Sequence, residues 1–261
     1  MGPVLAEERR RQLLQWLEEE GRIQVTDAAR RLAVSPMTVR RDLERLEADG
    51  LLVRTRGGAL PVGTATPREL PYASKRARQV EAKRKIGRLA ASLVQAGETV
   101  VLDAGSTTLE IARHLPPRVA LKVVTNDLLI ARELADREDI DVYVTGGLVR
   151  RGVYSLQGPE TEAYLRATHV DRAFLGADGV DAVYGLSTTN RQKVPVKQAM
   201  LAAAEHTYVV ADHTKLGRRA FARFAAVGEV GALICDEEAR TACPSQLAAL
   251  EEAGLAILLA T

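Results

Sequence analysis

Apolar positions divide the chain into a short helical part and a longer part in which strands alternate with helices. In the first 60 residues, apolar side chains recur three and four positions apart, which predicts helices over 7–19, from Thr26 onward and over 36–49. From Thr99, short runs of Val, Leu and Ile alternate with helical patterns, which predicts an α/β fold with a mostly parallel sheet. The predicted strands are 99–102, 122–125, 141–145, 173–175, 208–211, 232–235 and 255–259, and the predicted helices between them are 107–114, 128–135, 160–167, 195–205 and 244–253.

The predicted helix over 36–49 has one apolar side and one side that carries arginines. Ser35 is a good N-cap, because its hydroxyl can accept a backbone N–H of the first turn, and Pro36 suits the first helical position. Val39, Leu43 and Leu46 form the apolar stripe. A capped helix of this kind fits a DNA groove, and the alternative is an ordinary surface helix with solvated arginines.

The segments on either side of this helix favour DNA binding. Thr26 is expected to cap the preceding helix, in which Ala28 and Ala29 are small enough for two helices to approach closely. Residues 33–35 then form a tight turn, so the arrangement is a helix-turn-helix. After the helix, residues 51–56 and the following Gly-Gly pair predict a β-wing, with Arg54 and Arg56 directed toward a phosphate backbone.

Three segments resemble the signature of the DeoR family of bacterial transcriptional regulators: Arg40–Leu43, Gly50–Arg54 and Arg56–Ala59. The resemblance covers the whole amino-terminal region and implies that 36–49 is a recognition helix. It implies base contacts by Ser35, Thr38, Arg40 and Arg41 and phosphate contacts by Arg45, Arg54 and Arg56, with Met37 also on the DNA-binding helix at a position where the family often has a polar residue.

The basic charge is concentrated near the amino end, although the net charge of the chain is only +2. Residues 1–60 hold 11 Arg and 10 acidic residues, and residues 61–88 hold 8 Lys or Arg against 2 Glu. A basic segment next to a DNA-binding region can meet a polyanion.

Residues 61–71 are rich in Pro, Gly and Thr and are expected to be a linker between a domain at 1–60 and a domain at 72–261. A basic helical pattern then begins at Tyr72 and runs to about Val94. Its cations have three interpretations: a solvated face, added attraction to DNA, or a helix that transmits motion between domains. These cations are Lys75, Arg76, Arg78, Lys83, Arg84 and Lys85.

Polar or glycine residues follow five successive predicted strands, where ligands bind in parallel sheets. The turn 103–108 opens a helix with a glycine and three hydroxyl residues, which suits a phosphate, although such a turn is often a plain helix cap. The resemblance to the DeoR family extends over this region and implies a sensor domain similar to ribose-5-phosphate isomerase that binds a phosphorylated sugar or polyol. It implies phosphate binding by Ser106, Thr107 and Thr108, and reading of hydroxyls or a carbonyl by Asp103, Asn126, Asp178, Lys197 and Lys215. Independently of the resemblance, Gly105 lets the backbone of this turn approach a ligand closely, and Gly146 and Gly147 are effector-site candidates because they follow the third of these strands. Lys197 has a structural alternative, which is pairing with Glu205 or Glu162 at the surface.

Several classes of site are not expected. The chain has neither the GxGxxG nor the GxxxxGK[ST] pattern, so no nucleotide cofactor is predicted. Its four histidines form no metal-spaced pair, and its two cysteines are isolated, so no metal site is predicted. No apolar run has the length of a membrane span, and a cytoplasmic location is expected.

Three functions remain open at this point. The first is a homo-oligomeric repressor, dimer or tetramer, that binds double-stranded operator DNA of a carbohydrate operon and leaves it when a phosphorylated sugar or polyol binds. The second is a sugar-phosphate isomerase with a DNA-binding appendage, using Asp103 or Asp178 as base and Lys197 or Lys215 as electrostatic stabiliser. The third is an architectural DNA-binding protein whose second domain only oligomerises. We favour the first, with no catalytic residue.

Overall fold

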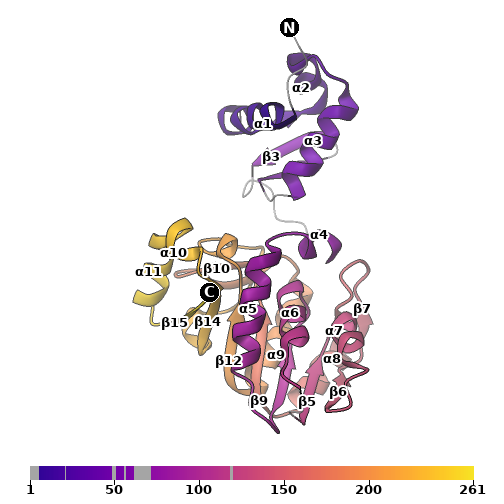
Figure 1. The fold of residues 1–261 in the computed structure, drawn as a ribbon, viewed down its shortest axis with the longest axis vertical. Coiled ribbons are helices and arrows are strands. Elements are labelled where there is room, and N and C mark those ends of the chain that lie inside the picture. Colours follow the sequence, from indigo (N-terminus) through magenta and orange to yellow (C-terminus); the bar gives the residue numbers. More distant parts are fainter. Residues whose placement is uncertain (1–5, 21, 49–50, 56, 62–71, 118–119) are drawn as a thin grey trace. The chain divides into compact units, whose positions relative to one another are not determined.

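The computed structural model describes residues 6–20, 22–48, 51–55, 57–61, 72–117 and 120–261. They belong to two compact units, Met1–Pro67 and Arg68–Thr261, each with its own hydrophobic core (Figure 1). No helix in these ranges is both long enough and apolar enough to cross a membrane.

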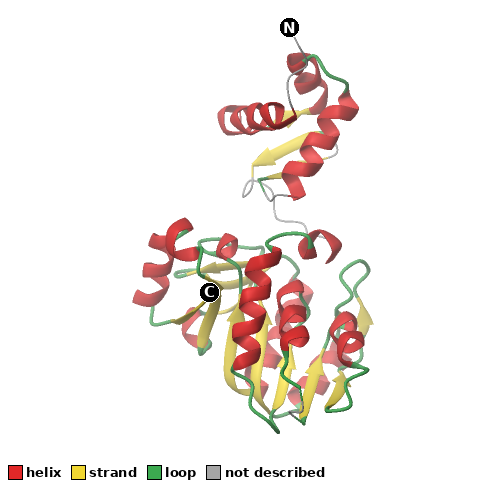
Figure 2. Ribbon diagram, viewed as in Figure 1, coloured by secondary structure: helices red, strands yellow, loops and turns green. Residues whose placement is uncertain are grey.

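The smaller unit is a helix-turn-helix followed by a β-hairpin, as the sequence predicts (Figure 2). Apolar side chains from all three helices and the sheet form its core, and Leu13 and Leu43 are fully buried there. The antiparallel sheet has the order β1-β3-β2. The elements are α1 (Ala6–Glu20), β1 (Ile23–Gln24), α2 (Val25–Leu32), α3 (Pro36–Ala48), β2 (Leu52–Thr55) and β3 (Gly58–Pro61).

Two local features of this unit differ from the sequence prediction. The prediction that Thr26 caps this helix is wrong, because α2 begins at Val25 and its N-cap is Gln24, which makes no side-chain cap hydrogen bond. Strand β1 was not predicted, since only its pairing with β3 makes its two residues a strand. At this pairing Gly58 is essential for space: a Cβ atom there would lie 1.6 Å from the carbonyl oxygen of Ile23. The predicted helix end at 49–50 lies outside the described residues.

The larger unit is built on a seven-stranded sheet in which every neighbouring pair is parallel. All seven predicted strands are present, and the prediction of a mostly parallel sheet is confirmed. The order is β15-β14-β12-β9-β4-β5-β6. The strands are β4 (Thr99–Leu102), β5 (Leu121–Thr125), β6 (Ile140–Val144), β9 (Val170–Gly176), β12 (Ala204–Val210), β14 (Ala232–Asp236) and β15 (Ala256–Ala260).

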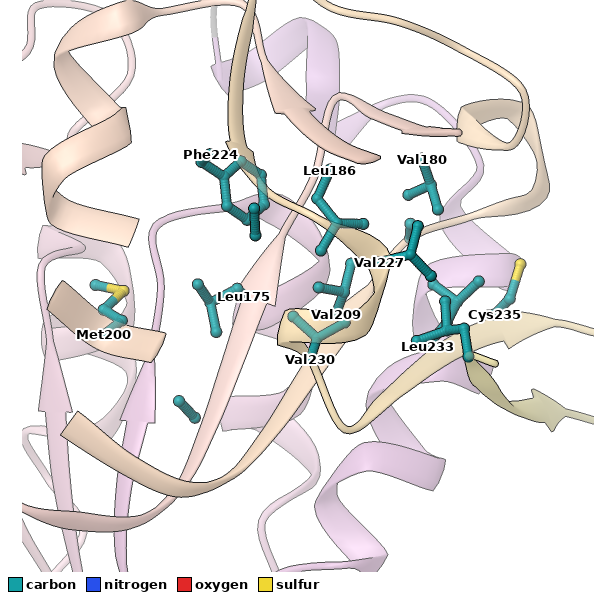
Figure 3. Packing of buried hydrophobic residues seen from close by; sticks show 14 of the residues in the cluster. Leu175, Val180, Leu186, Met200, Val209, Phe224, Val227, Val230, Leu233 and Cys235 are labelled. Carbon is teal, nitrogen blue, oxygen red and sulfur yellow. The ribbon is translucent and has the colours of Figure 1, made fainter. Parts of the chain in front are cut away.

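Helices cover both faces of this sheet, because successive side chains of a strand point to opposite faces. In β4, Val100 and Leu102 pack with α5 (Val80–Ser92), α6 (Ser106–His114) and α7 (Leu128–Leu134). Val101 belongs to the opposite core, with side chains from α8 (Pro159–Arg166), α9 (Val194–Ala203) and α11 (Pro244–Glu252). Figure 3 shows part of this second core, where Met200 of α9 packs near Leu175 of β9.

Two predicted helices of the larger unit are wrong in extent. The single helix over 72–94 is in fact α4 (Tyr72–Arg76) and α5, separated by a break at which Gln79 adopts a left-handed backbone conformation with φ 49°. The helix over 195–205 ends at Ala203, because the chain from Ala204 onward pairs with Val170 of β9.

Short antiparallel elements beside the main sheet were not predicted. They are too short, or buried on both faces, to show the alternation that marks a strand. They form a three-stranded sheet of order β10-β11-β13 and the hairpin β7–β8. Their bounds are β7 (Leu148–Val149), β8 (Leu156–Gln157), β10 (Gly179–Asp181), β11 (Gly185–Thr188) and β13 (Ala222–Ala225), and the remaining short helices are α10 (Ala239–Ala242) and the 3-10 turns Arg191–Lys193, His213–Lys215 and Val227–Glu229.

Candidate functional site

One side of α3 is exposed and carries the side chains that the sequence predicts to read DNA. The Ser35 hydroxyl accepts a hydrogen bond from the backbone N–H of Thr38 at 3.1 Å, so the predicted N-cap is present. Val39, Leu43 and Leu46 pack into the core of the small unit. Thr38 is half-buried, and the other predicted base-contact residues are exposed. Met37 and Arg45 are exposed on the same helix. The predicted base-contact residues are Ser35, Thr38, Arg40 and Arg41.

A partly buried ion pair between α1 and α3 fixes the orientation of α3, and the sequence reasoning gave its carboxylate no role of its own. Asp42 is 5% exposed and lies on the buried side of the helix. Arg9 of α1 donates to it through Nε at 2.8 Å and Nη2 at 3.3 Å. A two-pronged contact of this kind restricts rotation of α3 relative to α1.

The wing arginine Arg54 contacts α3 in this structure. Its Nη1 lies 3.0 Å from Oε1 of Glu44, and its backbone N–H donates to Oε1 of Glu47 at 3.0 Å. A phosphate contact by Arg54 would therefore replace the contact with Glu44. The second predicted wing cation, Arg56, lies outside the described residues.

In the larger unit, a cavity of about 90 Å³ lies at the carboxyl ends of β12, β9 and β4, which are neighbours in the sheet. The loops that follow these strands line it with residues from 104–108, 176–178 and 210–215. A further wall comes from Lys75, Arg78 and Lys83 of the α4–α5 segment, and Lys193 and Lys197 line it from the other side. We call this the strand-end cavity.

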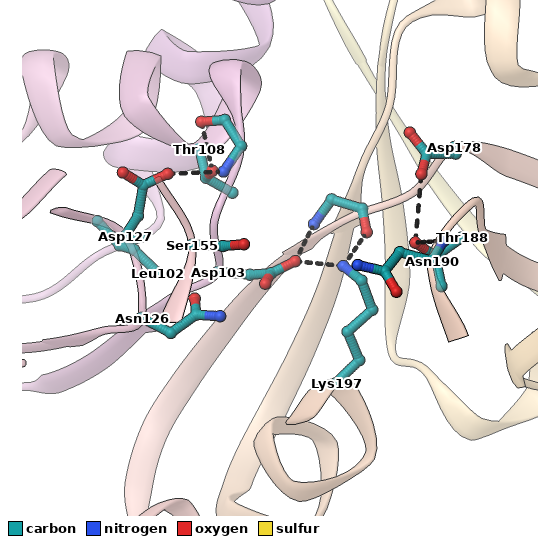
Figure 4. Close-up of polar contacts among 12 residues, drawn as sticks. Leu102, Asp103, Thr108, Asn126, Asp127, Ser155, Asp178, Thr188, Asn190 and Lys197 are labelled. Atoms are coloured by element: carbon teal, nitrogen blue, oxygen red, sulfur yellow. Dashed lines mark hydrogen bonds and ion pairs between the residues drawn. The ribbon is translucent and has the colours of Figure 1, made fainter. Parts of the chain in front are cut away.

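The start of α6 supplies the hydroxyl-rich wall of the strand-end cavity. Asp127 Oδ2 accepts a hydrogen bond from the Gly105 N–H at 3.1 Å, and Thr108 Oγ1 donates to the Gly105 carbonyl at 2.9 Å (Figure 4). Burial raises the pKa of Asp127 to about 6, against the lowering effect of the backbone N–H groups that it accepts. Ser106 and Thr107 line the cavity at the first turn, where helix N–H groups lack intrahelical partners and favour an anion.

A buried ion pair joins the loops after β4 and β9. Lys197 donates to Asp103 and, at 2.6 Å, to the carbonyl of Gly176, whose N–H in turn donates to Asp103 Oδ2 at 3.1 Å (Figure 4). Both charged side chains are less than a tenth exposed. The alternative in which Lys197 pairs with Glu205 or Glu162 at the surface is therefore wrong.

Asp178 occupies another side of the strand-end cavity. Its Oδ1 lies 2.9 Å from Lys75 Nζ, and its Oδ2 accepts from the hydroxyls of Thr188 and Thr189 at 3.2 and 3.0 Å. Burial alone would raise the pKa of this carboxyl, but Lys75 and Lys193 outweigh that effect and hold the pKa well below its usual range. Asp178 is therefore a fixed negative charge among cations.

Lys83 connects the two helices that flank the break at Gln79. It is 5% exposed, and its ammonium donates to the backbone carbonyls of Lys75 in α4 and of Arg78 in the break that follows. Burial lowers its pKa to about 8, which the charge of Asp212 partly opposes. Lys83 therefore lines the cavity, and its hydrogen bonds to these carbonyls also hold α4 in place.

Most of the predicted effector residues line the strand-end cavity, and four do not. Asp103 lies beneath the cavity in the ion pair with Lys197. Asn126 is 1% exposed and donates to a backbone carbonyl of β8. Gly146 and Gly147 follow β6, which is two strands away from β4, about 10 Å across the sheet. The lining residues are Gly105, Ser106, Thr107, Thr108, Asp178, Lys197 and Lys215.

Cations of the α4–α5 segment are the main residues that sequence reasoning missed at the cavity. A single continuous helix would place them along a solvated face, but the break at Gln79 changes their direction. Arg76 and Arg84 remain exposed, whereas others of the same run line the cavity. The run of basic residues was the available signal for these lining residues, but the sequence of the run did not reveal the break at Gln79. The missed polar and charged lining residues are Lys75, Arg78, Lys83, Thr188, Lys193 and Asp212.

The structure also brings together a group that spacing along the chain did not reveal. His213, Asp236 and Glu238 offer nitrogen and oxygen atoms within 4.8 Å of one another. His213 Nδ1 already lies 2.6 Å from Asp236 Oδ2, and the His213 N–H donates to the same carboxylate at 2.8 Å. These contacts fix the loop that carries Asp212 and Lys215 at the cavity.

Two family profiles match the chain. Residues 9–63 match the DeoR-like helix-turn-helix domain, and residues 78–237 match the DeoR C terminal sensor domain. The chain is 38% identical over 233 residues to the HTH-type transcriptional regulator GlpR of Haloferax volcanii, covering 89% of this chain and 91% of that protein. It is 36% identical over 230 residues to the HTH-type transcriptional repressor GlcR of Bacillus subtilis, covering 88% of each. It is 33% identical over 232 residues to the lactose phosphotransferase system repressor of Streptococcus mutans, covering 88% and 92%.

Solved structures with a similar chain path are more distant. Ribose 5-phosphate isomerase A of Methanocaldococcus jannaschii aligns with a TM-score of 0.39 at 20% identity, over 52% of this chain and 54% of that one. The full-length sorbitol operon regulator SorC of Klebsiella pneumoniae aligns with a TM-score of 0.38 at 12% identity, over 80% and 91%.

Proposed function

This chain belongs to the DeoR family of transcriptional regulators, and from that membership we propose that it is a repressor of a carbohydrate-metabolism operon that a phosphorylated sugar or polyol releases from DNA. The observation that carries the proposal is the strand-end cavity, in which the start of α6 and several cations surround a small space. The relative named as a transcriptional repressor and the relative named as the lactose phosphotransferase system repressor support the same function.

In this proposal α3 enters the major groove of operator DNA. The N-cap Ser35 and four residues of α3 face base edges, because the core leaves these positions exposed or, at Thr38, half-buried. The four residues are Met37, Thr38, Arg40 and Arg41. Arg45 and the wing arginines neutralise phosphates, which adds affinity without sequence information. A homo-oligomer with two-fold symmetry would place two such helices about 34 Å apart, one turn of DNA.

The strand-end cavity binds the phosphate of the effector. N–H groups at the start of α6, together with Ser106 and Thr107, supply hydrogen-bond donors, and Lys83 and Lys215 supply positive charge. The carbohydrate part then extends toward Lys197 and Asp178. This assignment uses residues from three neighbouring strand ends, which is where parallel sheets bind ligands.

Helix α4 couples the cavity to the DNA-binding unit. It is the first described element after residue 71, and it makes two contacts with residues that line the cavity: Lys75 with Asp178, and the Lys75 carbonyl with Lys83. An anionic effector attracts Lys75 and Lys83 and so changes the contacts that hold α4 in place. By linkage, operator DNA must weaken effector binding by the same factor as effector weakens DNA binding.

Fluorescence anisotropy with an operator selected from a DNA library tests both halves of the proposal. A screen of sugar and polyol phosphates should find one that lowers operator affinity 5- to 150-fold, which is about 1–3 kcal/mol of coupling. Arg41→Ala should remove the preference for the operator over random DNA, and Arg132→Ala, an exposed arginine of α7, is the matched control. Lys215→Ala should remove the response to effector and keep operator binding. Operator affinity that no phosphorylated compound changes would contradict the effector half.

A further inference from the structure

Strand β6 is one edge of the seven-stranded sheet (Figure 1). It pairs with β5 on one side, and no described strand pairs with its other side. The N–H of Thr145 donates to the Thr125 carbonyl at 3.1 Å, so position 145 faces β5. Because backbone groups alternate in direction along a strand, the N–H and C=O groups of Val142 and Val144 face the open side. Strand β6 can therefore pair with one more strand.

Exposed apolar side chains are concentrated at this edge. Eight large apolar side chains are exposed in the described part of the larger unit, and four of them lie within residues 143–149. Proteins usually protect an edge strand with lysine, proline or a bulge, and β6 has none of these; its single charged residue is Asp141. An unprotected edge beside an apolar patch indicates that another polypeptide chain pairs there. The four side chains are Tyr143, Val144, Leu148 and Val149.

The exposed charges at the two ends of β6 are opposite in sign. Asp136 and Glu138 precede the strand and Arg151 follows it, and none of the three forms an ion pair within the part of the chain that the structure describes. A second copy related by a two-fold axis places its own β6 antiparallel to the first. The acidic end of each strand then comes to the basic end of the other. The edge is complementary to itself in charge, which favours a second copy of this chain as the occupant.

We propose that two copies of this chain dimerise by pairing β6 with β6 across a two-fold axis, which joins their sheets edge to edge. The outward backbone groups of Val142 in one copy bond with those of Val144 in the other, so the two Tyr143 side chains lie opposite each other at the axis. This register gains an aromatic cross-strand pair. The inference goes beyond the proposed function and does not depend on the strand-end cavity, which lies at β12, β9 and β4.

A cysteine at the axis tests the pairing in the full chain. Directly opposite residues that share no hydrogen bond have Cα atoms about 4.5 Å apart, which a disulfide can span. Tyr143→Cys should therefore give a covalent dimer under mild oxidation, seen on a non-reducing gel. Asp141→Cys is the matched control, because its two copies would lie more than about 13 Å apart along the paired strands. The wild type controls for Cys235 and Cys243. Absence of the Tyr143→Cys dimer, or equal cross-linking of Asp141→Cys, would overturn the proposed pairing.

Sedimentation velocity of the full chain without DNA tests whether this edge drives association. Tyr143→Arg sets two like charges opposite each other and should weaken dimerisation at least about tenfold. Phe221→Arg changes another exposed aromatic side chain of the same unit and should leave dimerisation unchanged. Both variants should keep the wild-type circular dichroism spectrum, because both side chains are exposed in the single chain.

Three results of the sedimentation experiment would overturn the inference. The first is a wild type that stays monomeric at every concentration, which would leave the edge to a different protein. The second is a dimer that folded Tyr143→Arg forms as tightly as the wild type. The third is an open-ended assembly that grows with concentration, which indicates head-to-tail pairing of β6 with β15, the strand at the other edge of the sheet.

Discussion

Raising the pH should weaken effector binding and stabilise the effector-free protein, both through Lys83. Burial lowers the pKa of this lysine from 10.5 to about 8. It is then about 90% charged at pH 7 and about 10% charged at pH 9. If the charged form binds the phosphate, effector affinity should decrease about tenfold between these pH values, which is about 1.4 kcal/mol.

The effect on stability has the opposite sign. A lysine whose pKa is lower in the folded state than in the unfolded state takes up more protons on unfolding, so folding becomes more favourable as pH rises through the window from about 8 to 10.5. Integration from pH 7 to pH 9 gives a gain of about 1.3 kcal/mol from this group, because the unfavourable burial of its charge is relieved.

Two assays at pH 7, 8 and 9 and constant ionic strength measure these effects on the full chain. Calorimetry with sorbitol 6-phosphate gives the affinity, and urea unfolding without ligand gives the stability. The phosphate itself stays dianionic, since its second pKa is about 6. Lys83→Met is the control and should show weaker binding with little pH dependence. An affinity that is constant from pH 7 to 9 in the wild type, or a tenfold decrease that persists in Lys83→Met, would refute the assignment to Lys83.

Three further outcomes follow from contacts described above. Lys197→Met should lower the free energy of unfolding, measured with urea, by about 3–5 kcal/mol, because Asp103 then stays charged and buried without its partner. Adding Asp103→Asn to the same chain should recover a large part of this loss. A loss below about 1 kcal/mol in the single variant would contradict the prediction. Gly58→Ala should destabilise the small unit and abolish DNA binding while effector binding persists, since its Cβ would overlap the Ile23 carbonyl; normal DNA affinity would show that the β1–β3 pairing is dispensable. The full chain should not interconvert ribose 5-phosphate and ribulose 5-phosphate, because both candidate bases are already bound by lysines, Asp103 by Lys197 and Asp178 by Lys75. Measurable turnover in a coupled assay would support the isomerase hypothesis.

The sequence predicted the parts of this fold that depend on local patterns. Seven apolar runs became the seven strands of the parallel sheet, and Ser35 became a helix cap, because hydrophobic periodicity and capping chemistry act within a few residues. Strand β1 and the three-stranded sheet β10-β11-β13 were missed because they exist only through pairing with distant segments.

In the candidate site, too, the sequence predicted what depends on local patterns and missed what depends on contacts between distant segments. Residues that follow strands could be selected, because parallel strands end at one edge. Together with Lys197 of α9 they made up the eleven predicted effector residues, and seven of these eleven line the cavity. The order of strands could not be derived, so Gly146 and Gly147 were included although β6 is at the far edge. The left-handed turn at Gln79 has no strong signature in the sequence, and without it the direction of Lys75 and Lys83 was not predictable.

The order in which these contacts become available has a consequence for synthesis on the ribosome. The small unit is complete by residue 67, whereas Lys75 meets Asp178 only 103 positions later and Asp103 meets Lys197 after 94. Because domains generally fold as they emerge, the nascent polypeptide carries a finished DNA-binding module before its sensor exists. A premature stop codon between these points would therefore yield a fragment that keeps the DNA-binding module and lacks the cavity through which a metabolite would release it.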